Sequence, residues 1–334
     1  MPKLAAFSTD LLHDLATRQL LPPLQPAALA QAEAQAPFSV HTELRTMLYA
    51  GVLTLAGGLG ALLYENHQRL GPAVVLTFMT LVLVAAAWYA ARHRPAFTWG
   101  VAPRTSVAAD YALLLACLLL LGLEGYAQAQ YSVFGTRYGL ATALPALVFL
   151  PLAYRYDHRG VLALGITALA AWVGVSAAPL GFLNGDFTAA GLNGPAFWLG
   201  AALIAAAFHA EWTAHKAHFA PTYLSLGANV AAAALLATLI QQWGYTGAVV
   251  AASGALAGVC LALYLFAQRT QSLWFLVLAA AWAYVLLTYL FFRFGAVLGF
   301  DESALVLIPL YFIASAIGFV RFFGRLKTFF APRP

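Results

Sequence analysis

The chain has 334 residues, of which 63% are hydrophobic and only 9% are charged. Soluble domains carry about a quarter charged residues, so this composition excludes an ordinary soluble protein and predicts a surface that mostly faces hydrocarbon. The formal net charge of +5 says little about partners, because in a membrane protein the positions of the basic residues matter more than their sum. We expect membrane lipids as partners and no nucleic acid.

Residues 1–44 are predicted to form a short cytoplasmic helical segment. The stretch STDLLHDLATRQL has capping residues followed by leucines mostly at helical spacing, and PAALAQAEAQA is a second helix-forming stretch. The alternative is a frayed leader that rests on the membrane surface. The segment lacks the basic start, short apolar run and cleavage site of a signal peptide.

Ten apolar stretches follow, each near the roughly 20 residues with which a helix crosses about 30 Å of hydrocarbon. Lipid offers backbone amides no hydrogen-bond partner, so each span must be a helix. The fold class is therefore all-α: a polytopic integral membrane bundle over residues 45–323, followed by a basic cytoplasmic tail at 324–334. The predicted spans are 46–64, 71–91, 107–128, 138–154, 160–178, 196–212, 222–242, 246–267, 272–292 and 303–322.

The basic residues predict the orientation of this bundle. If the N-terminus is cytoplasmic, all of the 17 Lys and Arg fall in inside segments except Arg69, Arg137 and Arg293. The positive-inside rule favours this arrangement, and an even number of spans then places the C-terminus in the cytoplasm too. We expect the protein in the inner (cytoplasmic) membrane of a bacterium.

The stretch LRTMLYAGVLTLAGGLGALLYENHQRLGP, between the N-terminal segment and the later spans, resembles a known family. This is the predicted-membrane-protein family called domain of unknown function 2157, whose members open with a cytosolic helical stretch and a Gly-rich first span. Glu65 and Asn66 match its Glu-Asn-Trp-like turn, whereas His67 stands in place of the aromatic residue. The resemblance covers about residues 8–90 and implies a membrane protein, without assigning an activity, a cofactor or a site residue.

An acidic residue within a membrane span is a functional candidate, because charge in hydrocarbon costs at least a few kcal/mol. Glu124 lies in the third span, and Asp110 is 14 residues earlier on the same helical face, since 14 steps of about 100° fall only about 40° short of four turns. One interpretation is a proton or cation path along this span. The other is an ion pair between Glu124 and Arg137, which begins the fourth span.

A second group of polar residues is predicted at the outer rim. Glu65 and Asn66 lie at the tip of the hairpin between the first two spans, where water and lipid headgroups can solvate them. Arg293 lies near the outer end of the ninth span, close to Asp301 and Glu302. A rim salt bridge, contact with headgroups or an anion site would each explain this arginine.

The stretch HAEWTAHKAH at 209–218 is the most enzyme-like part of the sequence. If it is helical to its end, Glu211, His215 and His218 fall within about 60° of arc, and such side chains are zinc ligands. The spacing matches no established metal motif such as HExxH, and His and Lys are expected at a cytoplasmic interface. We therefore disfavour a metal site and expect no cofactor.

No nucleotide-binding, phosphate-binding or nucleophile motif occurs, so the sequence does not predict an enzyme. The favoured hypothesis is a transport-like protein for a small solute, a proton or another cation. The alternative is a membrane scaffold or sensor in which residues 1–44 bind a cytoplasmic protein. A membrane-embedded metal-dependent hydrolase is the third and least favoured hypothesis. Gly254 and Gly258 are predicted to form a close helix-packing face.

Overall fold

The structure is a computed structural model of the chain and describes residues 41–103, 106–135, 137–177, 191–298 and 304–329. The chain divides into two units, residues 1–59 and residues 60–334, which are taken separately below. The predicted N-terminal segment at 1–44 lies almost entirely outside the described residues and stays a prediction.

In the first unit, the described residues form the beginning of helix α3 (His41–Leu70), which continues into the second unit. The stretch Thr46–Gly58 is apolar and helical, as expected for the first predicted span. The Thr54 hydroxyl donates to the Ala50 carbonyl at 2.8 Å. This hydrogen bond, one turn back along the helix, satisfies a polar group that lipid could not solvate.

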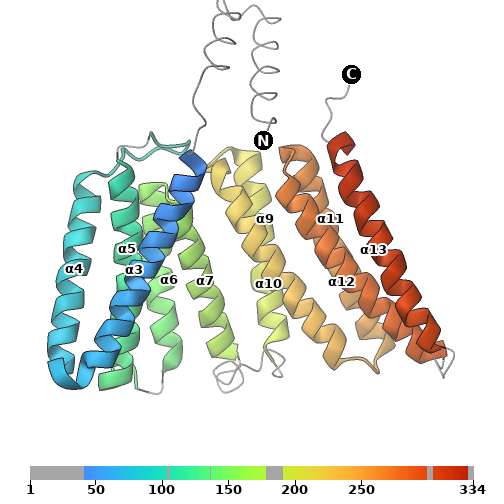
Figure 1. Ribbon diagram of the computed structural model, residues 1–334, viewed down its shortest axis with the longest axis horizontal. Coiled ribbons are helices and arrows are strands. Elements are labelled where there is room, and N and C mark those ends of the chain that lie inside the picture. The colour runs from blue at the N-terminus through green and yellow to red at the C-terminus, as the bar shows by residue number, and fades with distance from the viewer. Residues whose placement is uncertain (1–40, 104–105, 136, 178–190, 299–303, 330–334) are drawn as a thin grey trace, which may run out of the picture. The chain divides into compact units, whose positions relative to one another are not determined.

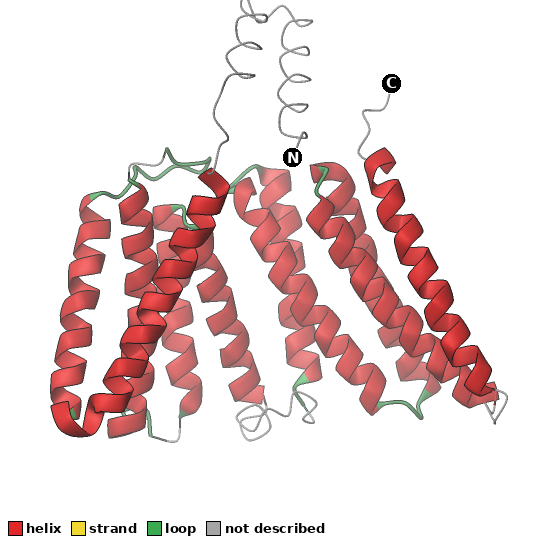
Figure 2. Ribbon diagram, viewed as in Figure 1, coloured by secondary structure: helices red, strands yellow, loops and turns green. Residues whose placement is uncertain are grey.

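All regular secondary structure in the described residues of the second unit is helical, and loops join the helices (Figures 1 and 2). Each α-helix overlaps one predicted span, because the Gly, Pro and polar breaks in the sequence are where the chain turns. After α3, the described helices are α4 (Pro72–Arg92), α5 (Val107–Tyr131), α6 (Tyr138–Tyr156), α7 (Arg159–Ala177), α9 (Asn193–Thr213), the 3-10 helix η1 (Ala217–Phe219), α10 (Ala220–Gln241), α11 (Thr246–Thr270), α12 (Leu273–Leu298) and α13 (Ala304–Phe329).

Seven of the described helices are long and apolar enough to cross a membrane, with η1 and α10 counted as one. These seven are α4, α5, α6, α7, η1 with α10, α11 and α12. The predicted all-α fold with several apolar spans is therefore confirmed, while the count of ten and the orientation stay predictions. At the far end, α13 continues to Phe329, so residues 324–329 of the predicted tail are helical.

Consecutive helices of the second unit alternate in direction, which sorts their connections into two groups (Figure 1). The loop after α4 and the turns α6–α7, α9–α10 and α11–α12 lie at one end. The turns α3–α4, α5–α6 and α10–α11 lie at the other. The first group consists of the connections that the sequence predicts to be cytoplasmic, so residues far apart in the chain can meet there.

The closest helix packing in the described part of the chain joins α9 and α10. A Cβ atom added to Gly200 would lie 2.5 Å from the Ala231 backbone nitrogen, and one added to Gly227 would lie 2.7 Å from the Leu203 Cβ. The predicted packing face at Gly254 and Gly258 is wrong, because a Cβ atom at either would meet nothing within 4 Å. Both pairs of glycines, Gly200 with Gly227 and Gly254 with Gly258, lie in apolar helices. Only the three-dimensional packing distinguishes the two pairs.

We expect Gly227→Ala to destabilise the protein, since the added methyl group must displace backbone and Cβ atoms of α9. Overpacking of this kind costs about 1–3 kcal/mol. Gly254→Ala is the matched control, because it meets open space and should leave stability unchanged or raise it by up to about 1 kcal/mol. Thermal unfolding in detergent measures both, and equal melting temperatures for the two variants would contradict the close approach of α9 and α10.

Candidate functional site

The most highly connected polar site of the described residues is a buried cluster of Asp157, Lys216 and His218. Asp157 Oδ1 lies 2.6 Å from Lys216 Nζ and 2.6 Å from His218 Nε2. The side chains are only 7%, 1% and 11% exposed, respectively. Lys216 is one of the largest fully buried side chains, which is exceptional for lysine and requires a paired anion.

The local backbone brings these three residues together by ending two helices sharply. Helix α6 stops at Tyr156, and Asp157 adopts the left-handed conformation with φ 57°, its N–H donating to the Ala153 carbonyl. Helix α9 stops at Thr213, and Ala214 (φ 56°) and Lys216 (φ 50°) are also left-handed. Left-handed residues are common just after a helix, and here they turn each side chain back toward the bundle.

The cluster also holds the loop that follows α4. The second carboxylate oxygen of Asp157 accepts a hydrogen bond from the Ala102 N–H at 2.7 Å. The Lys216 N–H donates to the Trp99 carbonyl at 2.7 Å. Asp157 and its partner lysine thereby join three connections: the loop after α4, the turn between α6 and α7, and the turn between α9 and α10.

Aromatic rings surround the lysine side of the cluster. Lys216 Nζ lies 5.5 Å from the centre of the Phe97 ring and 5.9 Å from that of Phe219. Ring faces attract cations and exclude water, so they favour the ammonium group in a site that solvent barely reaches. The Tyr154 ring packs edge to face on Phe219 and its hydroxyl lies 2.9 Å from that of Tyr223, which extends the packing into the core.

The surroundings of Asp157 change the pKa of its carboxyl group. Burial raises the pKa, but the hydrogen bonds from Lys216 and Ala102 and the charges of His218 and Lys216 outweigh it and lower the pKa below its ordinary value. The carboxylate is therefore ionised at neutral pH and matches the lysine charge. Both carboxylate oxygens and the ammonium group are hydrogen-bonded, so the arrangement acts as a clamp between loops.

The predicted metal ligands are not brought together. The prediction required a helix from His209 to His218, but α9 ends at Thr213. His218 contacts Asp157 instead, and the exposed His215 packs its ring edge to face on Trp99. Among the described residues, no group of three or more His, Cys, Asp or Glu is placed to hold a metal ion.

Glu124 lies in α5, and both of its carboxyl oxygens are buried without a hydrogen-bond partner among the described residues. The exposed Arg137 at the start of α6 does not reach it, so the alternative of an ion pair between these two residues is absent from the described structure. The carboxyl group is thus a buried ionisable group that the surrounding helices leave unsatisfied.

Asp110 lies in the first turn of α5, just after Ser106, whose hydroxyl accepts from the Ala109 N–H at 3.4 Å. A negatively charged side chain in this position interacts favourably with the positive N-terminal end of the helix dipole. Between Asp110 and Glu124, the same face of α5 carries Leu114, Cys117 and Leu121. Both acids lie on one face of α5 with these apolar side chains between them, and an ion path along this span stays a prediction.

The predicted rim site of Glu65, Asn66 and Arg293 stays a prediction. Glu65 is exposed near the end of α3, and the side chain of Asn66 is outside the described set. Arg293 lies in α12 with its guanidinium carbon 5.4 Å from the centre of the Trp243 ring. Stacking on tryptophan, rather than a salt bridge, is its described contact.

Sequence reasoning missed Asp157 and Lys216. The two residues are 59 residues apart in the chain, so no local sequence pattern connects them. The available signals were the Asp157-His158-Arg159-Gly160 turn and the lysine just before α10, both of which occur in segments predicted to lie on the same side of the membrane.

Part of the chain is similar in sequence to a known family. Residues 13–162 match domain of unknown function 2157. This family is described as a predicted membrane protein, and the match confirms the predicted resemblance. It extends past the residues that carried the resemblance to the start of α7, and so includes Glu124 and Asp157 but not Lys216 or His218. No curated protein and no solved structure matches the chain.

Asp157→Asn is expected to destabilise the protein by about 3 kcal/mol, because it leaves the Lys216 charge buried without its anion. Lys216→Met is also expected to destabilise, and the double variant should lose less than the sum of the two. Chemical unfolding of the full chain in detergent micelles measures all three free energies. Additive losses would show that the two side chains do not interact.

The stability supplied by Asp157 is expected to depend on pH. Because its pKa is lowered by folding, the contribution is fully present above the unfolded value of about 4 and is lost as the pH falls through the folded value. The melting-temperature difference between wild type and Asp157→Asn should therefore shrink as the pH falls below about 4. A difference that stays constant down to pH 3 would contradict this origin.

Proposed function

We propose that this membrane protein transports a proton or a small cation, alone or coupled to a solute, and that Glu124 is the ion-binding group. The observation that carries the proposal is the burial of both Glu124 carboxyl oxygens without a partner among the described residues. An unpaired carboxylate in a low-dielectric interior is costly. Binding a proton or a cation removes that cost, which makes Glu124 suited to take up an ion and release it again.

The surroundings favour a single carrier group over a polar wire. The apolar side chains of Leu114, Cys117 and Leu121 separate Glu124 from Asp110, so ions have no row of polar groups to follow along α5. A carrier group needs instead to be exposed alternately to the two sides of the membrane. The buried position of Glu124 corresponds to an occluded state in such a cycle.

The proposal includes a non-enzymatic role and a cytoplasmic location of both termini. The connections that the sequence predicts to be cytoplasmic lie at one end of the second unit (Figure 1), which supports a consistent sidedness. We place the protein in a bacterial inner membrane on the basis of the distribution of Lys and Arg.

The decisive experiment is proton flux into liposomes that contain the full chain and an internal pH-sensitive dye, under an imposed pH gradient. We expect the wild type to conduct and Glu124→Gln to fall to the level of protein-free liposomes, because an amide cannot exchange a proton. Glu124→Asp should retain part of the flux. Asp110→Asn is the matched control on the same helix face and should leave the flux unchanged.

Two further measurements make the result interpretable. Circular dichroism and thermal unfolding establish that Glu124→Gln is folded, and the same assay with Na⁺ and K⁺ gradients tests other cations. Equal flux in wild type and folded Glu124→Gln would contradict the role of Glu124. No flux of any of these ions in the wild type would contradict ion transport itself.

A further inference from the structure

An exposed apolar face of α4 ends in an arginine. α4 is one of the seven helices that are long and apolar enough to cross a membrane, and its large exposed side chains fall within about 120° of arc at 100° per residue. These side chains are Val74, Phe78, Leu81, Val84 and Trp88. Arg92 ends α4 on the same face, with its guanidinium carbon 5.4 Å from the centre of the Trp88 ring. In a membrane, hydrocarbon covers the apolar part of this face, and headgroups then lie beside Arg92.

Two more arginines lie beside Arg92. Arg94 follows in the loop after α4, and Arg155, in the last turn of α6, donates from Nη1 to the carbonyl of Pro95 at 2.9 Å. The three residue steps from Arg92 to Pro95 span at most about 11 Å. The three guanidinium groups are therefore within reach of one lipid headgroup.

The described protein does not neutralise these three charges. Among the described residues, the ion pairs all belong to the Asp157 cluster, and none involves the three arginines. Arg92 and Arg94 are exposed, and Arg155 is half-buried. An arginine presents five N–H donors in a planar fork that matches phosphate oxygens, and Arg155 uses one of them on Pro95. The group therefore suits an anion with several acceptor oxygens.

We propose that Arg92, Arg94 and Arg155 bind the phosphate of one anionic phospholipid, such as phosphatidylglycerol, at the end of α4 that the sequence predicts to be cytoplasmic. The apolar face of α4 favours a lipid over a soluble anion or an acidic protein. A lipid bound there packs its acyl chains on that face while its phosphate meets the arginines. Trp88 lies between the two regions, as expected for tryptophan at a membrane interface.

The loop after the arginines is suited to the same interface. Phe97, Trp99 and Val101 occupy alternate positions in it and are 48%, 55% and 72% exposed. Basic residues next to exposed aromatic side chains are typical of segments that lie in the headgroup region. The loop is held against the protein by the Asp157 clamp at Ala102, so it keeps Arg94 at the level of the headgroups.

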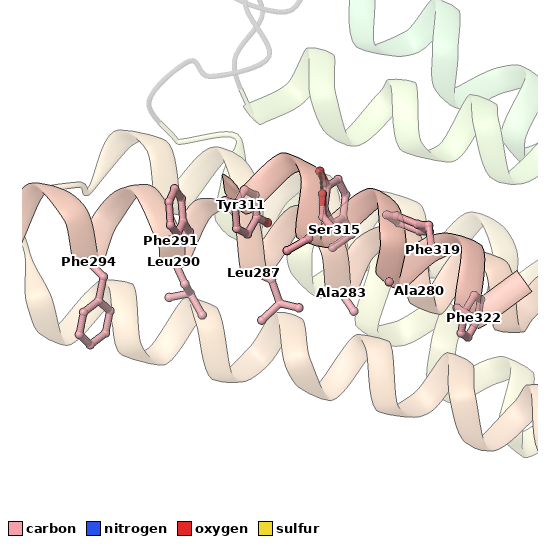
Figure 3. A pocket seen from close by; sticks show the side chains of 13 residues that line it. Ala280, Ala283, Leu287, Leu290, Phe291, Phe294, Tyr311, Ser315, Phe319 and Phe322 are labelled. Carbon is pink, nitrogen blue, oxygen red and sulfur yellow. Dashed lines mark hydrogen bonds between the residues drawn. The ribbon is translucent and has the colours of Figure 1, made fainter. Parts of the chain in front are cut away.

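Two other surfaces provide controls. The groove between α12 and α13 is lined by apolar and hydroxyl-bearing residues without a charged side chain (Figure 3), so a lipid that touches it has no reason to prefer one headgroup. Arg293 lies 5.4 Å from the centre of the Trp243 ring, the same distance as Arg92 from Trp88. No other Lys or Arg occurs in α12 or in residues 242–245, so Arg293 reproduces the stacking without the group of charges.

The test measures lipid binding to the full chain in detergent micelles by native mass spectrometry. Phosphatidylglycerol and phosphatidylcholine are titrated separately, because both contain one phosphate but only phosphatidylglycerol carries a net negative charge. Arg94→Gln is the principal variant, since Arg94 makes no hydrogen bond or ion pair with the described residues and its replacement should not affect folding. Arg293→Gln is the matched control, and thermal unfolding establishes that each variant is folded. If Arg94→Gln does not fold, Arg92→Gln replaces it.

We expect the wild type to bind phosphatidylglycerol more tightly than phosphatidylcholine. Arg94→Gln should weaken phosphatidylglycerol binding about fivefold, the effect of one basic residue near an anionic membrane surface, and Arg293→Gln should leave it unchanged. Replacing all three arginines by glutamine should abolish the preference between the two lipids. Inorganic phosphate in tenfold excess should not displace phosphatidylglycerol, because it has no acyl chains to pack on α4.

Three results would overturn the proposal. Equal wild-type affinity for the two lipids would show that the arginines recognise no anionic headgroup. An equal loss in Arg94→Gln and Arg293→Gln would show that only the total charge matters. Displacement of the lipid by inorganic phosphate would assign the arginines to a soluble anion. None of these results depends on whether Glu124 carries ions.

Discussion

The hydrogen-bonded ion pair between Asp157 and Lys216 is the interaction on which the predicted cytoplasmic end of the second unit depends. Lipid and a helical interior both penalise unpaired charge, so two buried charges must be brought to the same point. Because Asp157 follows α6 and Lys216 precedes α10, their pairing fixes the ends of helices that are far apart in sequence. The Ala102 and Trp99 backbone contacts add the loop after α4 to the same point.

The clamp and the close packing of α9 on α10 support each other. Lys216 lies in the connection between these two helices, and Gly200 and Gly227 let their backbones approach where side chains would keep them apart. Within lipid there is little hydrophobic driving force for helices to associate, so packing and interhelical polar contacts must hold them together. Here the packing lies within the span and the strong polar contact lies at its end.

The sequence predicted the helices because their cause is local. A span must be about 20 apolar residues long, and the breaks Gly71-Pro72 and Asp157-His158-Arg159-Gly160 can be recognised without a partner. The clamp could not be predicted, because Asp157 and Lys216 become neighbours only when α6, α9 and α10 are in place.

The helical projection of 209–218 failed for a related reason. Ala214 and Lys216 leave the helical conformation so that the lysine can reach Asp157. The sequence alone shows that Glu124 is an acid within a span, but its lack of a partner among the described residues depends on the positions of the nearby helices.

Asp157 and Glu124 therefore separate into different roles on physical grounds. Asp157 has every hydrogen bond that a buried carboxylate needs, and its charge is matched by a lysine, so a change in its protonation would cost stability. Glu124 has no such partners among the described residues, so the fold gains nothing from keeping it charged.

Asp157 and Glu124 are nevertheless connected through the chain. Ala102 is held by Asp157, and four residues later Ser106 caps α5; a chain of that length spans at most about 14 Å. The clamp thus limits where α5 can begin, and α5 carries Glu124.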